Sequence, residues 1–496
     1  MRRIVSMVVA ATSAIVVGAQ GPSARDADVQ FQLGNLLYEE ARYRDALDAY
    51  RQAIDADHSG LSLRARIGFV RTALRLGEFE QAQEAAVALH AQHAGSAEAI
   101  SMSGDAHWAA GLFDEAEARW REALAIEPAL SRARHGLAKA LASRGRLDEA
   151  MVEAQAALKA APRDEEMHHT VGAIFERMHR YEQAAAAYTN FVNLLPNKDR
   201  SDKAAWSRAQ IRFLRSFGER QPNHIPDDQA DRLHTVDFKV VDDKVVIQAR
   251  VNGGRPQDFV VDTGSELTTI SRPTASARGV RPITYTLTAG VGEVGLRGLQ
   301  LGRLDTLEIG TLKMSNVPVL IKAPALRNIP KREAESLSPL ALGLSLTVDY
   351  TSNRLTIGRR LPEEPAKYRL PMRHHRLSMV RGLLNDTHPA YFVVDTGGEV
   401  ISISTATAEA LAKEPPRRIA LKVYGTSGWD RDAFLLPGID LRFDEIAYSN
   451  FSLVVLNLRA PSVLLGFQLG GIVGHKFLSP YRVSLDLERS ELRMAN

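Results

Sequence analysis

The chain has no cysteine among its 496 residues. It therefore forms no disulfide, carries no lipoprotein attachment at its start, and has neither a cysteine nucleophile nor a thiolate ligand for a metal. Charge of a single sign is also missing, because 62 Lys and Arg stand against 59 Asp and Glu, and the net charge of +3 is spread along the chain. This balance argues against nucleic acid as a partner and against a polybasic membrane surface.

An apolar run stands at the start of the chain, where Met1-Arg2-Arg3 precedes a stretch from Ile4 to Ala19. A basic start, an apolar segment and small residues at its end are typical of a secretory signal, so we expect a signal peptide over 1–19, cleaved after Ala19. The alternative is an uncleaved anchor, although 16 residues are short for crossing a bilayer. We expect an exported protein, periplasmic or secreted. It would be membrane-anchored if the signal is not cleaved, and it would have no stable membrane insertion after cleavage.

A repeat with a period of 34 residues occupies the first two hundred residues, and the small residues that mark it are Ala82, Ala116, Ala150 and Ala184, with Ala46 upstream. Small residues at a helix crossing let two antiparallel helices approach, and an aromatic residue fills the space beside them. The aromatic or small residues that follow at a fixed spacing are Tyr50, Trp120, Ala154 and Tyr188. The pattern resembles the tetratricopeptide repeat, in five copies over 27–198. Unit two fits less well, because Gly68 lies two positions out of register.

The period of the apolar pattern changes after the repeats. Residues 199–217 have helical spacing and are interpreted as a capping helix, whereas 218–235 have no apolar period and are interpreted as a linker. Beyond them, short β-rich runs with a period of two, such as Val245–Val251, alternate with turn residues. The predicted fold class is therefore α plus β and multidomain, with an N-terminal α-solenoid and a mostly-β C-terminal half.

A duplicated segment is the most informative feature of the C-terminal half. Phe259 to Glu266 (FVVDTGSE) returns 133 residues later as Phe392 to Glu399 (FVVDTGGE). One Asp-Thr-Gly triplet would arise by chance in about one chain in twenty of this length. Two triplets, each after an apolar strand and in matching context, indicate a duplication. An apolar pair before glycine also recurs, as Ala341-Leu342-Gly343 and Ile472-Val473-Gly474. Two homologous lobes are predicted, over 236–360 and 361–496.

These residues resemble the aspartic peptidases of the retropepsin and pepsin group, over essentially all of 236–496. The resemblance implies a bilobal, mostly-β fold in which each lobe supplies one catalytic aspartate. Its catalytic pair would be Asp262 and Asp395. The resemblance also implies that each aspartate loop is threaded by the apolar-apolar-glycine segment of its lobe.

The resemblance assigns further roles around the two aspartates. The hydroxyls of Thr263 and Thr396 would form hydrogen bonds across the axis between the lobes, and Gly264 and Gly397 would leave room for close backbone approach. Ser265 is interpreted as hydroxyl support for the first carboxylate. Its counterpart Gly398 can give no such support, because it has no side chain.

Two glycine-bearing segments follow their aspartates by some thirty residues, where flap hairpins that cover a substrate belong. The flap candidates are Gly292, Gly295, Gly425 and Gly428. Like charges about 3 Å apart cannot both ionise, so two carboxyls share one proton, as is established for aspartic proteases. Such a pair activates a water for peptide hydrolysis without a cofactor.

Two functions stay open at this stage. The first is an exported aspartic endopeptidase whose repeats fold separately and either recruit a substrate or partner protein or cover the cleft. The second is a catalytically inactive scaffold that uses both parts to bind peptides. His374-His375 would suggest a metal, but no matching carboxylate or cysteine spacing accompanies them, so they are interpreted as a solvated turn. No metal is expected.

Overall fold

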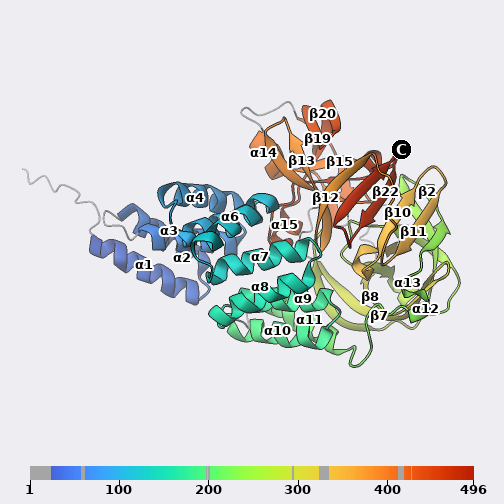
Figure 1. Ribbon diagram of the computed structural model, residues 1–496, viewed down its shortest axis with the longest axis horizontal. Coiled ribbons are helices and arrows are strands. Elements are labelled where there is room, and N and C mark those ends of the chain that lie inside the picture. Colours follow the sequence, from blue (N-terminus) through green and yellow to red (C-terminus); the bar gives the residue numbers. More distant parts are fainter. Residues whose placement is uncertain are drawn as a thin grey trace, which may run out of the picture.

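The computed structural model describes residues 24–56, 62–196, 198, 202–292, 295, 297–322, 335–411, 418–425 and 427–496. The expected signal peptide, residues 1–19, lies outside this set. Figure 1 shows the helices of the first half as one array beside a β-rich second half. Within the described residues, no helix is both long and apolar enough to cross a membrane.

The helices of the first half pack against their sequence neighbours as repeats do (Figure 1). Their bounds are α1 (Ala24–Glu39), α2 (Tyr43–Ala56), α3 (Ser62–Leu76), α4 (Phe79–Gln92), α5 (Ala97–Ala109), α6 (Phe113–Ile126), α7 (Ser131–Ser143), α8 (Leu147–Ala160), α9 (Glu165–Arg177) and α10 (Tyr181–Leu194). A further helix, α11 (Asp202–Arg215), follows and packs on α10. These eleven elements, α1 to α11, are called the array below.

Aromatic rings fill the spaces that glycines leave between neighbouring helices. An added Cβ would come within 2.7 Å of the Tyr50 ring at Gly34 and within 2.5 Å at Gly68. Gly136 meets the ring of Trp120 in the same way, at 2.1 Å. Gly68 is therefore not an irregularity of unit two. It makes the contact with the preceding repeat that Gly136 makes two repeats later.

The strands of the first lobe form a sheet of eight among the described residues. In spatial order the strands are β2 (Lys239–Val241), β3 (Lys244–Val251), β4 (Gln257–Val261), β9 (Ser336–Leu337), β5 (Thr268–Ser271), β8 (Leu312–Lys322), β7 (Arg297–Ile309) and β6 (Pro282–Thr288). Short helices of this lobe are α12 (Asp227–Ala230), α13 (Arg272–Ala277) and the 3-10 turn η1 (Leu340–Leu342).

A second sheet, of thirteen strands within the described ranges, contains the strands of the second lobe and joins it to the first. Its order is β1 (His234–Asp237), β11 (Arg354–Gly358), β10 (Ser345–Asp349), β22 (Arg482–Asp486), β23 (Glu491–Ala495), β12 (Tyr368–His375), β13 (Leu377–Leu384), β14 (His388–Val394), β21 (Gly471–Val473), β15 (Ile401–Ser404), β20 (Ile446–Leu456), β19 (Phe434–Phe443) and β16 (Ile419–Ala420). Separate from it are the hairpin β17 (Val423–Gly425) and β18 (Gly428–Asp430) and the helices α14 (Thr405–Leu411), α15 (Arg459–Leu465) and α16 (His475–Leu478).

The two lobes meet where β10 of the first pairs antiparallel with β22 of the second. Thr347 lies opposite Ser484 in this register, and their hydroxyl oxygens are 2.8 Å apart. Both residues come from matching positions of the duplicated halves, so the pairing relates one lobe to the other. The predicted fold class, a helical repeat array followed by a β-rich bilobal region, is confirmed.

Residues 218–235 are not a free linker, which corrects the prediction. Ile225 is 3% exposed and belongs to the apolar core of the two β-rich lobes. The backbone N–H of His224 donates to the carbonyl of Ser315 on β8 at 3.0 Å. The segment then forms α12 and enters β1 at His234. Because its apolar and backbone groups are satisfied by the first lobe, it is part of that lobe.

The array packs directly against both lobes. One apolar cluster joins α5, α6 and α7 to the second lobe, and in it the ring of Phe113 lies 4.8 Å from that of Tyr391 and 5.0 Å from that of Phe467. Another cluster joins Phe213 of α11 to Leu301 of β7 in the first lobe. The array therefore shares apolar cores with both lobes, and whether it folds separately stays a prediction.

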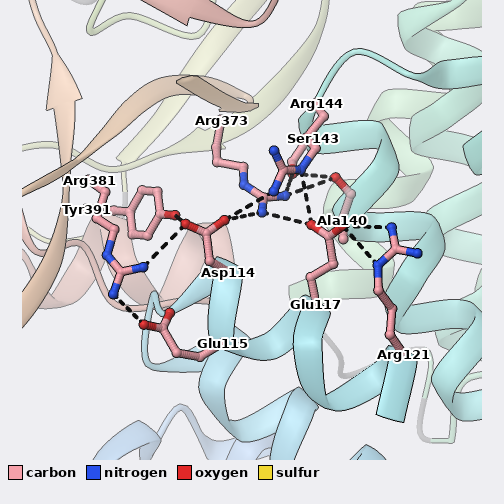
Figure 2. A network of polar contacts seen from close by, with 10 residues as sticks. All are labelled: Asp114, Glu115, Glu117, Arg121, Ala140, Ser143, Arg144, Arg373, Arg381 and Tyr391. Carbon is pink, nitrogen blue, oxygen red and sulfur yellow. Dashed lines mark hydrogen bonds and ion pairs between the residues drawn. The ribbon is translucent and has the colours of Figure 1, made fainter. Parts of the chain in front are cut away.

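A buried polar network accompanies the apolar contact with the second lobe (Figure 2). Arg373 of β12, whose side chain is 3% exposed, donates to Glu117 at 2.8 Å, to Ser143 at 3.2 Å and to Asp114. The Tyr391 hydroxyl donates to Asp114 at 2.5 Å. Burial acts to raise the pKa of Asp114, but the Tyr391 hydroxyl and the Arg373 guanidinium together lower it below its ordinary value.

Candidate active site

Asp262 and Asp395 each stand directly after a buried strand, β4 and β14. The backbone N–H of Asp262 donates to the Leu337 carbonyl on β9 at 2.8 Å, and that of Asp395 donates to the Val473 carbonyl on β21 at 3.0 Å. Strands β9 and β21 run parallel to β4 and β14. The two aspartate loops are therefore held in the same way by equivalent strands.

This equivalence corrects one detail of the predicted duplication. The counterpart of Ile472-Val473-Gly474 in the first lobe is the short strand Ser336–Leu337, and not Ala341-Leu342-Gly343. The latter segment overlaps η1, and Gly343 ends it with a left-handed φ of 75°. A two-residue strand has no recognisable apolar period, which is why the pattern favoured the wrong segment.

Two threonines lock the aspartate loops together. The Thr263 hydroxyl donates to the Val394 carbonyl at 2.6 Å and accepts from the Thr396 backbone N–H at 3.0 Å. The Thr396 hydroxyl donates to the Val261 carbonyl at 2.6 Å and accepts from the Thr263 backbone N–H at 3.2 Å. Both threonines are buried. This reciprocal exchange is the arrangement that the resemblance implied.

Glycines let the two carboxyls approach each other. A Cβ at Gly264 would lie 2.4 Å from Cγ of Asp395, and a Cβ at Gly397 would lie 3.0 Å from Cγ of Asp262. Each glycine therefore faces the aspartate of the other lobe, where any larger residue would collide with it. The two carboxyl groups are therefore close enough for each to affect the pKa of the other.

The pKa values of the two carboxyls are raised for different reasons. Burial and then the charge of Asp395 raise the pKa of Asp262 to about 7. Burial also raises the pKa of Asp395, but backbone N–H groups of Gly397, Gly398 and Gly264 oppose it by stabilising the ionised form. The Gly397 donor lies 2.8 Å from Oδ1 of Asp395. When the pair holds a single proton, this amide donor favours Asp395 as the ionised partner.

The expected role of Ser265 is corrected by its hydrogen bond. Its hydroxyl donates to the Leu267 carbonyl at 2.9 Å, so its single proton is not directed at Asp262. On the other side no hydroxyl stands at Gly398, and the backbone N–H of Gly397 supports the Asp395 carboxylate instead, at 2.8 Å. Backbone amides of the loops, rather than neighbouring hydroxyls, thus stabilise the charge.

The two flap segments meet at their tips. The Ser427 backbone N–H, in the turn between β17 and β18, donates to the Val291 carbonyl of the first lobe at 2.9 Å. The Ser427 hydroxyl accepts from the Gly290 backbone N–H at 3.1 Å. Both segments therefore contribute to one connection, and each lobe supplies half of it.

Three of the four flap glycines lie at this connection or shape it. A Cβ at Gly425 would lie 2.1 Å from the Val291 carbonyl oxygen, and one at Gly292 would lie 2.5 Å from the Ser427 carbonyl carbon. Gly428 has a φ of 103°, which favours glycine in the turn of the second flap. A Cβ at Gly295 would meet nothing within 4 Å.

A cavity of about 2470 Å³ lies between the array and the lobes. Its wall includes Asp262 and Gly264 from the aspartate loop and side chains of α3, α5, α7, α9 and α11. His374 and His375 of β12 also line it, and burial first of all lowers the pKa of each to about 3. They are part of a cavity wall, which corrects the interpretation as a solvated turn. Across the described ranges, no group of three or more His, Asp or Glu side chains could hold a metal.

Comparisons with known proteins agree with both halves of this description. Residues 247–346 match the aspartyl protease family model, and residues 107–174 match a tetratricopeptide repeat model. The chain therefore carries tetratricopeptide repeats followed by an aspartyl protease-like domain, as the sequence predicted.

Solved structures similar to the array include a thermophilic tetratricopeptide repeat protein of Thermus thermophilus, with 19% identity, a TM-score of 0.32, and coverage of 37% of this chain and 98% of its own. MamA of Desulfovibrio magneticus is 16% identical, with a TM-score of 0.25 and coverage of 34% of this chain and 94% of its own. None of the curated proteins matches the chain significantly.

Proposed function

We propose that the chain is an aspartic endopeptidase that hydrolyses peptide bonds through a water activated by Asp262 and Asp395. The observation that carries this proposal is the pair of carboxyls, one from each lobe, that each face the glycine of the opposite loop and have raised pKa values. The reciprocal threonine bonds and the family match over 247–346 support it.

The geometry supports a general acid–base mechanism. Ionised Asp395 takes a proton from the water while the water oxygen attacks the peptide carbonyl carbon, and protonated Asp262 donates a hydrogen bond to the carbonyl oxygen. A tetrahedral intermediate forms without a covalent bond to the enzyme. Its C–N bond then breaks as the nitrogen receives the proton held by Asp395, which releases an amine and a carboxylic acid and returns the shared proton to the pair.

The flaps and the array complete the proposal. The joined flap tips would cover an extended peptide and exclude water from the carboxyls. The array, which lines the same cavity as Asp262, would recruit the substrate or a partner protein, because tetratricopeptide repeats generally mediate protein–protein interaction. We further propose export to the periplasm or the medium, on the basis of the basic and apolar start of the chain.

Cleavage of an unfolded protein such as casein by the full chain tests the proposed activity. Asp262→Asn and Asp395→Asn should each abolish cleavage, because neither remaining carboxyl can both hold and accept the proton. Asp386→Asn is a matched control, since that side chain is 77% exposed in a turn of the second lobe. If the parent chain cleaves nothing over a wide pH range but still binds peptides, the alternative of an inactive peptide-binding scaffold is correct.

A further inference from the structure

Two cations in the cavity wall have no carboxylate partner within the part of the chain that the structure describes. The ammonium of Lys139 on α7 lies 5.1 Å and 5.3 Å from the ring centroids of Trp108 and Trp120. The guanidinium of Arg177 on α9 donates only to two backbone carbonyls, one of which belongs to His374 at 3.2 Å. Both side chains line the cavity that also contains Asp262.

The carboxylates whose charges act on Lys139 are paired with other cations. Asp105 accepts from Arg132 at 2.7 Å and also from the indole N–H of Trp120 at 3.2 Å. Glu166 forms ion pairs with other cations, among them Lys203 at 3.3 Å. Burial is the main cause that lowers the pKa of Lys139, and the charges of these carboxylates only partly offset it. The positive charge here therefore lacks a direct counter-charge.

This charged wall continues to the aspartate loop. The imidazole of His375 lies edge-on to Trp108, with ring centroids 5.8 Å apart, and its neighbour Arg376 forms an ion pair with Glu266 in the loop of Asp262. Burial, Arg376 and the two cations without a carboxylate partner lower the pKa of His375 to about 3. His375 is thus neutral, and it adds neither a countercharge nor a third cation.

We propose that Lys139 and Arg177 bind a carboxylate of the peptide substrate, so that the array selects acidic segments next to the site of cleavage. A cation that burial partly desolvates costs free energy until an anion neutralises it. The planar guanidinium of an arginine also suits a carboxylate. The cavity of about 2470 Å³ exceeds the several hundred Å³ that suit a small ligand, which favours a polypeptide. The carboxylate belongs either to an Asp or Glu side chain or to the C-terminus of the substrate.

Binding is measured first, in the full-length Asp395→Asn chain, which cannot cleave its ligand. Fluorescence anisotropy compares one labelled peptide containing Glu and Asp with its Gln and Asn counterpart, each with a free or an amidated C-terminus. The acidic peptide should bind roughly tenfold more tightly, since a hydrogen bond to a charged group contributes on that order. A difference confined to the free C-terminus would assign the site to a chain end, whereas a difference between Glu and Gln would assign it to side chains.

Lys139→Met in the same background should remove most of this preference, and Lys139→Gln should do the same without adding apolar surface. Lys159→Met is the matched control, because Lys159 lies exposed on the neighbouring helix α8, and it should keep the preference. Equal affinity of acidic and neutral peptides in the parent, or a preference that survives Lys139→Met and Arg177→Met alike, would overturn the proposal. Inorganic phosphate binding as tightly as the acidic peptide would overturn the assignment to a polypeptide.

The role of this carboxylate site in cleavage rests on the proposed peptidase activity, and kinetic measurements test the two separately. With fluorogenic versions of the two peptides, Lys139→Met should raise KM for the acidic one and leave kcat nearly unchanged. Equal rates of cleavage of the acidic and the neutral peptide would refute the carboxylate site but not the proposed peptidase activity. Tight and selective binding of the acidic peptide without any cleavage would refute the proposed peptidase activity but not the carboxylate site.

Discussion

Replacement of Arg373 by methionine tests whether the array and the second lobe unfold as one unit. Methionine keeps most of the apolar stem but removes the donors that reach Glu117 at 2.8 Å, Ser143 at 3.2 Å and Asp114. Removing one partner of a buried ion pair costs about 3 to 5 kcal/mol. Because Asp114 is partly exposed and keeps the Tyr391 hydroxyl, we expect the lower end of that range.

Urea unfolding followed by tryptophan fluorescence measures this cost, since Trp108 and Trp120 lie in the shared apolar core. Arg369→Met on the same strand is the control. Its side chain is 38% exposed and pairs with surface carboxylates such as Glu491 at 3.2 Å, so its loss should cost about 0 to 1 kcal/mol. If Arg373→Met destabilises the chain no more than this control does, the network does not hold the two parts together.

Further predictions concern the carboxyl pair and the flaps. Asp262→Asn, Asp395→Asn and the double variant should lose nearly equal activity, as groups that act together do, whereas losses that multiply in the double variant would contradict a shared proton. Activity should be bell-shaped in pH and decline above the pKa of about 7 for Asp262, where the shared proton is lost; a rate that rises steadily to alkaline pH would refute this. Because that pKa is raised in the folded state, the stability contributed by Asp262 is fully present below about pH 4 and is lost as the pH rises through about 7. Asp262→Asn should therefore unfold at a higher temperature than the parent at pH 8, and a lower temperature would contradict the raised pKa. Gly425→Ala would place a methyl 2.1 Å from the carbonyl oxygen of the opposite flap tip, so kcat/KM for a peptide should fall while the melting temperature stays nearly unchanged; unaltered kcat/KM would exclude a role for the flap contact.

The aspartate loops could be predicted from the sequence because each is a contiguous segment that the duplication repeats. In each lobe an apolar strand leads directly into the Asp-Thr-Gly turn, so the pattern is contained in a few consecutive residues. The second copy, 133 residues later, identified the second aspartate. The strand that lies beside each aspartate loop was harder to predict from the sequence. Ser336–Leu337 is only two residues long, so its place depends on its hydrogen bonds and not on any pattern of apolar residues.

The docking of the array could not be predicted in the same way. Arg373 and Asp114 are 259 residues apart, and nothing in either segment indicates the other. A run of arginine and histidine, Arg373 to Arg376, has the composition of a solvated turn. In the folded chain the array covers Arg373, and the other three residues line the cavity. An arginine such as Arg373 is buried only where carboxylates face it, and the carboxylates of the array come to face it only when the chain is folded.

The contact of the array with both lobes has a mechanical consequence for the cleft. Phe113 packs on the second lobe and Phe213 on the first, so a rotation of one lobe relative to the other must either separate an apolar contact or change the curvature of the helices between them. The flap tips are joined by a few hydrogen bonds and open at a smaller cost. A protein that straightens or tightens the array on binding would in turn shift the two lobes relative to each other around the fixed aspartate loops, and the rate of cleavage would then depend on that binding.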